Sequence, residues 1–160
     1  MDKILAMGKA PIFFLSLLLF VHFPSPSKDS DVENFKSLKS NEVNVRVGPS
    51  GEIPIILTYR TIFLPVKIIA EYDNWYKITD LDGDGGWVKK YLLSNYRTVI
   101  TTDGGLIYSN HMGRAYPKYR VEKNVILGLG KCKKERCKVF VRSGKTKDSG
   151  WMDKKNLWGI

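Results

Sequence analysis

The sequence predicts an all-β protein made of two similar small units behind an N-terminal signal helix. Three observations lead to this prediction. Short apolar runs alternate with polar residues at a period of two, as half-buried strands require. Gly, Pro, Asn and Asp gather between these runs, where tight turns need them. Finally, the segment at residues 75–93 returns in altered form at residues 137–158.

The repeated segment has the pattern of a β-hairpin. Residues 75–79 alternate, LDGDGG (81–86) supplies the turn, and Gly-Trp-Val starts a return strand before a short helical turn at KKYLL. In the second occurrence Cys137 matches Trp75 at an offset of 62, and Trp151 matches Trp87 at an offset of 64. The second turn is therefore expected to be two residues longer.

Residues 1–27 are expected to be a secretory signal peptide. Lys3 and Lys9 precede the apolar run at 11–23, which is shorter than the ~20 residues of a transmembrane helix. The Ser-Pro-Ser ending at Ser27 offers small residues for cleavage. An uncleaved N-terminal anchor is the alternative. Cleavage would release the mature protein on the far side of the membrane across which it is exported.

The remaining chain divides into a lead-in and two units. Residues 28–39 are polar without a strong period and predict a flexible lead-in. Residues 40–94 form the first unit, which begins with the alternating sequence NVRV, and residues 95–160 form the second. At about 60 residues each, the units are near the lower size limit for a domain with its own core.

The positive charge is concentrated in the second unit. Residues 94–160 contain 15 basic and 5 acidic residues, whereas residues 28–93 contain 9 basic and 10 acidic residues. A basic surface favours anionic partners, although it also serves solubility alone. The basic half is compatible with nucleic-acid binding, but the export signal argues against it.

Three motifs in the first unit resemble the bacterial Src-homology-3-like (SH3-like) domain. They are NVRVGPS (44–50), the strand beginning WYKI (75–78), and GWVKKYLLS (86–94). The second unit resembles this family more loosely, through GWMDKKNLW (150–158). The double copy, the cysteine pair and the terminal NLWGI are similar to a two-repeat periplasmic branch. The resemblance implies two tandem partly open barrels of about five short strands each, acting as binding modules that often attach to the cell wall.

The residues do not favour catalysis, a metal or a cofactor. The expected mature chain has a single histidine, His111, in a polar loop without an evident partner. Asp80, Asp82 and Asp84 imitate the start of a calcium-binding loop, but Tyr91 occupies the twelfth position, where a glutamate belongs. A simple acidic hairpin turn is the alternative to calcium binding.

Cys132 and Cys137 are expected to form a disulfide. If Lys134 and Glu135 are a two-residue turn, Lys133 faces Arg136 and the two cysteines form the next pair across the hairpin. Export places them in an oxidising compartment, where such bonds persist. The alternative is two reduced cysteines that act as small apolar side chains.

Two groups of residues are candidates for ligand binding. Aromatic residues of the first unit could line a groove for a sugar or an extended peptide. Basic residues crowd the hairpin of the second unit and could face an acidic polymer. The candidates are Tyr72, Trp75 and Tyr91 in the first group, and Lys131, Lys133, Lys134, Arg136 and Lys138 in the second.

Two functions therefore remain open. The first is a non-enzymatic module that binds peptidoglycan or another anionic polymer of the bacterial envelope. The second is a periplasmic adaptor that docks a peptide or a partner protein. The membrane would be involved only through an uncleaved N-terminal segment.

Overall fold

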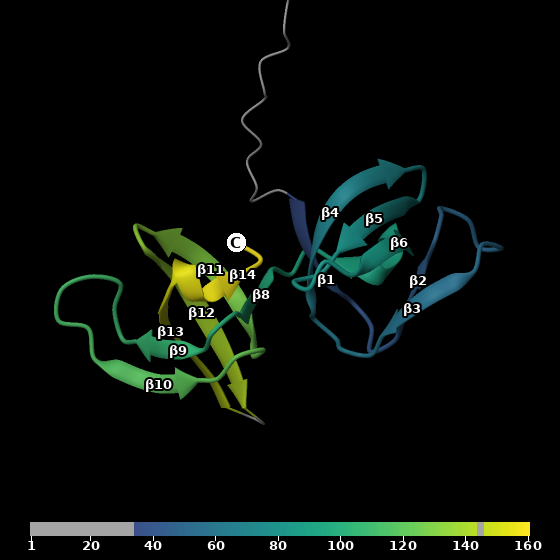
Figure 1. Ribbon diagram of the computed structural model, residues 1–160. Helices are drawn as coiled ribbons and strands as arrows, with labels where there is room; N and C mark the ends of the chain where they lie inside the picture. The colour runs from purple at the N-terminus through teal and green to yellow at the C-terminus, as the bar shows by residue number, and fades with distance from the viewer. Residues whose placement is uncertain (1–33, 144–145) are drawn as a thin grey trace, which may run out of the picture.

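The structure is a computed structural model that describes residues 34–143 and 146–160; the signal segment expected at 1–27 lies outside them. The described part is all-β, with two antiparallel seven-stranded sheets and almost no helix, which confirms the predicted class. The sheets form two separate lobes, one purple-blue to teal and the other green to yellow in Figure 1. Within the described residues, no helix is long and apolar enough to cross a membrane.

The first sheet has the strand order β3-β2-β6-β5-β4-β1-β7. Its alternating sequences explain its two faces: Val43 and Val45 are buried, whereas Asn44 between them is exposed. A single 3-10 turn, η2 (Lys90–Leu92), precedes the last strand. The strands are β1 (Phe35–Leu38), β2 (Val43–Arg46), β3 (Ile55–Tyr59), β4 (Pro65–Tyr72), β5 (Trp75–Thr79), β6 (Gly85–Lys89) and β7 (Leu93–Ser94).

The second sheet repeats this order strand for strand, as β10-β9-β13-β12-β11-β8-β14. Its 3-10 turn, η3 (Lys154–Asn156), also precedes the last strand. The strands are β8 (Thr98–Thr101), β9 (Gly105–Tyr108), β10 (Pro117–Val121), β11 (Ile126–Lys133), β12 (Arg136–Ser143), β13 (Thr146–Asp153) and β14 (Leu157–Trp158). The internal repeat predicted from the sequence is thus present in the topology.

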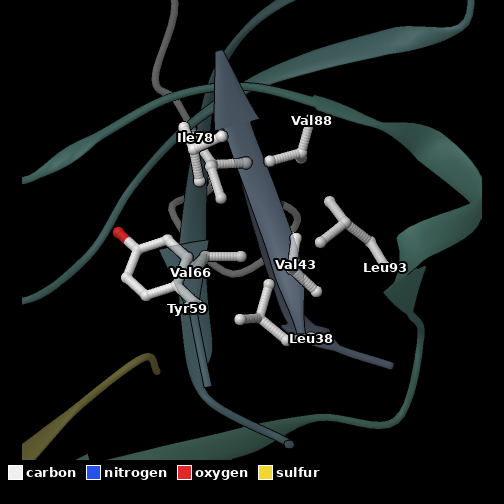
Figure 2. Close-up of a cluster of buried hydrophobic side chains, with 8 residues drawn as sticks. Leu38, Val43, Tyr59, Val66, Ile78, Val88 and Leu93 are labelled. Carbon is white, nitrogen blue, oxygen red and sulfur yellow. The ribbon is translucent and has the colours of Figure 1, made fainter. Parts of the chain in front are cut away.

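Each lobe has its own hydrophobic core. In the first lobe Leu38, Val66 and Ile78 converge between the strands, and the phenol oxygen of Tyr59 points out of the cluster (Figure 2). In the second lobe the core includes Met152 and Cys137, both fully buried. Burying such side chains stabilises each lobe by about 1.5–3 kcal/mol per large residue.

The structure corrects the alignment of the two copies. Lys77 pairs with Trp87 in the first sheet, and Lys138 pairs with Trp151 in the second. Cys137 therefore corresponds to Tyr76 at an offset of 61, and Trp75 corresponds to Arg136. The left-handed turn residues agree, because Asp73 (φ 45°) and Lys134 (φ 48°) are also 61 apart. A one-residue error matters, since it exchanges the two faces of a strand.

Two further expectations are revised. The flexible lead-in assigned to residues 28–39 is wrong for Phe35–Leu38, which form β1 and pair with β4 and β7. Phe35 and Leu38 are buried, and the four-residue strand is too short to show a clear period. The expected count of about five strands per unit is also too low, because β1 and the two-residue β7 bring the first sheet to seven.

Candidate functional site

The hairpin of β11 and β12 carries the largest group of sequence-predicted site residues. Lys133 lies opposite Arg136, and Cys132 lies opposite Cys137, as the two-residue turn predicts. Cys132 and Cys137 form a disulfide with a Cα–Cα distance of 3.9 Å, which confirms the predicted pair. Because Cys137 is completely buried in the core, the disulfide ties the exposed tip of the hairpin to the body of the sheet.

The five basic residues of the hairpin differ in their surroundings. Lys131, Lys133 and Lys134 are exposed at its tip. Lys138 is half-buried, and its Nζ lies 5.7 Å from the ring centroid of Phe140. The tip therefore carries three exposed cations, which we call the lysine tip.

Arg136 is held by its own sheet. Its Nε donates a hydrogen bond of 2.7 Å to Asp153 Oδ1, and its Nη1 donates one of 3.2 Å to the carbonyl oxygen of Asn110. The guanidinium carbon also lies 3.9 Å from the ring centroid of Tyr108. With its charge paired by Asp153 and its plane against an aromatic ring, Arg136 supports the hairpin rather than adding a cation to the lysine tip.

His111 packs against an aromatic side chain of β13. Its ring lies 4.6 Å from that of Trp151, with an interplanar angle of 38°. Partial loss of hydration lowers the pKa of His111 below 6.5, and the positive charges of Lys133, Lys134 and Lys131 lower it further. These effects favour the neutral form of His111, whose ring packs against Trp151.

The first copy has a pocket on the outer side of its sheet. Its volume is about 260 Å³, and it is lined by Asn44, Arg46, Gly51, Trp75, Lys89, Tyr91 and Leu92. Two of the predicted aromatic site residues meet here. Trp75 is only 5% exposed, whereas Tyr91 is 70% exposed. Trp75 therefore forms a wall of the pocket, and Tyr91 is the aromatic ring that a ligand could cover.

Two cations border this pocket. The Nζ of Lys89 lies 4.6 Å from the ring centroid of Trp75. Arg46 Nη1 donates a hydrogen bond of 2.5 Å to the carbonyl oxygen of Ile53. Tyr72, the third predicted aromatic residue, is 62% exposed at the end of β4 and is not among the residues that line the pocket.

The corresponding surface of the second copy is filled by the protein itself. Arg136 takes the place of Trp75, Asp153 that of Lys89, and Tyr108 that of Arg46. The Arg136–Asp153 ion pair and the Tyr108 ring occupy the region that is an open pocket in the first copy. The two copies are therefore not equivalent in what they can bind.

The acidic turn of the first copy is closed by its own hydrogen bonds. One carboxylate oxygen of Asp80 accepts bonds from the backbone N–H groups of Asp82 and Asp84, at 3.0 and 2.9 Å. The other accepts a bond of 2.9 Å from the hydroxyl of Tyr59. Residues 34–143 and 146–160 contain no group of three or more His, Cys, Asp or Glu side chains that could hold a metal ion. The geometry of this turn is that of a hairpin turn.

Residues 39–95 match the family model of the bacterial SH3 domain. This confirms, for the first copy, the resemblance identified through NVRVGPS and GWVKKYLLS. The bacterial SH3 domain is a family of binding modules, which often bind the cell wall. No curated protein matches the chain.

Several residues of these sites were missed by sequence reasoning, namely Arg46, Lys89, Tyr108, Asn110, Trp151 and Asp153. A correct offset of 61 between the β5 and β12 strands would have placed Arg136 opposite Asp153 on an outer face. The turn residues Asp73 and Lys134 carry that offset, but neither is a glycine, so their positive φ values leave little trace in the sequence.

Proposed function

We propose that the protein is a non-enzymatic binding module of the bacterial envelope, exported to the periplasm, that attaches to an anionic polymer such as peptidoglycan. In this proposal the two sheets are tandem SH3-like barrels at residues 40–94 and 95–160, extended by β1. The signal peptide at 1–27 directs export, and the second copy provides the attachment.

The lysine tip is the observation that carries this proposal. Lys131, Lys133 and Lys134 are exposed together on a hairpin that a disulfide holds in place. A rigid group of cations attracts a polyanion with a small loss of conformational entropy. The disulfide fits an oxidising compartment, and residues 94–160 carry a net charge of +10.

The test is sedimentation of the purified protein with cell-wall sacculi across a series of salt concentrations. Exposed charges are screened over about 10 Å at 0.1 M salt, so attachment should weaken steeply as salt rises. The variant K133E/K134E should lose attachment. The control K39E/K77E makes the same change in net charge at exposed lysines of the first copy. This control should retain most of the attachment.

Equal loss of attachment in K133E/K134E and K39E/K77E would mean that only the total charge of the protein matters, not the lysine tip. Attachment that does not change with salt concentration would overturn the proposal. We also expect no release of muropeptides from the sacculi, with or without zinc. Release that disappears in His111→Ala would contradict a non-enzymatic function.

The open pocket of the first copy favours a second candidate, an adaptor that docks a peptide or partner protein. Tyr91 offers an exposed aromatic ring beside Arg46 and Lys89. Aromatic and arginine side chains often dominate the energy of protein interfaces. Capture of an envelope protein that is lost in Tyr91→Ala, but kept in K133E/K134E, would favour this candidate over polymer attachment.

A further inference from the structure

A larger pocket lies on the second copy, between the base of the lysine hairpin and the last residues of the chain. Its volume is about 460 Å³, within the range of pockets that hold small ligands. It is lined by Arg97, Leu129, Gly130, Lys131, Cys132, Lys154 and Ile160. Among the residues predicted from the sequence to bind a ligand, Lys131 alone lines this pocket.

The floor of the pocket is apolar and supported from below. Leu129 and Ile160 pack against the hydrophobic core of the second lobe. Cys132 is held in place by its disulfide to the buried Cys137. An irregularity in the β11–β12 register between Leu129 and Cys132 adds a residue to β11. This extra residue interrupts the alternation of the strand, so Lys131 and Cys132 line the same pocket.

Three cations surround this apolar floor, and no Asp or Glu is among the lining residues. The α-carboxylate of Ile160, the last residue of the sequence, is their one anionic group, so the lining keeps a net positive charge. They come from three separate places: Arg97 precedes β8, Lys131 lies in β11, and Lys154 begins η3. Arg97 donates a hydrogen bond of 2.8 Å to the carbonyl oxygen of Gly159, which fixes its position at the edge of the pocket. Neither lysine makes an ion pair with any residue that the structure describes.

This arrangement matches a ligand that carries a negative charge directly beside a compact apolar group. Attraction between a lysine and a carboxylate is stronger next to an apolar surface than in open water, because screening is weaker there. An apolar side chain would cover Leu129 and Ile160 while the carboxylate reaches Lys131 and Lys154. A peptide that ends in an apolar residue has both groups on a single residue.

We propose that this pocket binds the carboxyl-terminal residue of a peptide whose last side chain is apolar. Lys131 and Lys154 bind the carboxylate, and Leu129, Cys132 and Ile160 contact the side chain. The site shares Lys131 with the lysine tip, but it also requires Lys154 and the apolar floor. Polymer attachment is instead tested at Lys133 and Lys134, which do not line the pocket. Either proposal can fail while the other holds.

The test is an NMR titration of the ¹⁵N-labelled protein with N-acetyl-L-leucine. We expect saturable shifts at the amide signals of residues 129–132, 154 and 160. Two matched probes separate the contributions: N-acetyl-L-leucinamide lacks the charge, and acetate lacks the side chain. Each should bind roughly tenfold more weakly or worse. The amide loses a charge-assisted hydrogen bond, and acetate loses the burial of the leucine side chain, and either loss changes affinity by about that factor or more.

Variants complete the test. Lys154→Gln should weaken binding of N-acetyl-L-leucine roughly tenfold, whereas Lys123→Gln, an exposed lysine outside the pocket, should leave it unchanged. K133E/K134E should also leave shifts at residues 129–132 in place. Equal binding of all three probes, or shifts confined to other residues, would overturn the proposal. Decanoate that binds more tightly than N-acetyl-L-leucine would assign the pocket to a fatty acid and would equally overturn it.

Discussion

Phe35 lies edge-on against Trp158, with ring centroids 5.0 Å apart and an interplanar angle of 87°. This contact joins the first strand of one lobe to the last strand of the other, since Phe35 begins β1 and Trp158 ends β14. Figure 1 shows the chain end close to the junction of the lobes, where β8 also runs.

A second aromatic contact between the lobes joins Phe63 and Tyr96, whose ring centroids lie 5.6 Å apart. The hydroxyl of Thr98 also donates a bond of 2.7 Å to the carbonyl oxygen of Phe63. The two lobes thus share an interface and unfold, we expect, as one cooperative unit.

Removing the Phe35 ring should make the two lobes unfold independently of each other. Phe35 is 7% exposed, and Phe→Ala at such positions lowers the free energy of unfolding by about 3 kcal/mol or more. Wild type should show a single transition in calorimetry, and Phe35→Ala two. A double-mutant cycle with Trp158→Ala should give a coupling of about 0.5–1.5 kcal/mol, the range of edge-to-face aromatic pairs. Tyr72→Ala, at a 62% exposed position, is the control. Strictly additive effects would contradict the shared interface.

Tyr59 should make the stability of the first lobe sensitive to alkaline pH. Burial raises the pKa of Tyr59 well above its usual value of 10, and the hydrogen bond to Asp80 raises it further. The neutral phenol is therefore favoured in the folded state. This contribution is complete below pH 10 and is lost as the pH rises from 10 towards the folded-state pKa.

The variant Tyr59→Phe should lose this alkaline dependence together with about 1.5 kcal/mol of stability at pH 7, the value of a hydrogen bond to a charged group. Urea unfolding at pH 7 to 11 measures both. The exposed Tyr91→Phe is the control and should unfold like wild type. If the free energy of unfolding falls equally steeply above pH 10 in wild type and in Tyr59→Phe, groups other than Tyr59 cause the fall.

The pKa of His111 should depend on the positive charge of the lysine tip. Loss of hydration and then Lys133, Lys134 and Lys131 lower its pKa. NMR titration of the His111 ring signals should therefore give a pKa below 6.5. The pKa should rise in 1 M salt, which screens the lysines, and in K133E/K134E, which reverses two of them. K39E/K77E should leave it unchanged. A pKa of His111 that changes neither with salt nor with charge reversal would show that the lysines are too far from the ring to affect it.

The mature protein should begin near Lys28. The basic start, the short apolar run and the Ser-Pro-Ser sequence of residues 1–27 are typical of a cleaved signal. Intact-mass measurement on protein from its native host should give the mass of residues 28–160. A mass that starts at Met1 would contradict cleavage and favour an N-terminal anchor.

The hairpins were the most predictable part of the structure. Their signals are local, because alternation and turn residues within about ten positions decide both the strands and the pairing. Lys134 and Glu135 alone determined that Cys132 would face Cys137. The short strand β1 was not predictable in this way. Its four residues are stabilised by pairing with β4 and β7, which lie about 30 and 55 residues further along the chain.

By itself, the sequence determined the all-β class, the internal repeat, the disulfide and the concentration of positive charge in the second copy. These properties depend on composition and on short-range spacing. The tertiary structure decided which charges are available. It pairs Arg136 with Asp153, buries Trp75, and brings Arg97, Lys131 and Lys154 around one apolar floor. The physical reason is that ion pairing and burial depend on contacts between distant strands, and a shift of one residue in their register exchanges the buried and exposed faces.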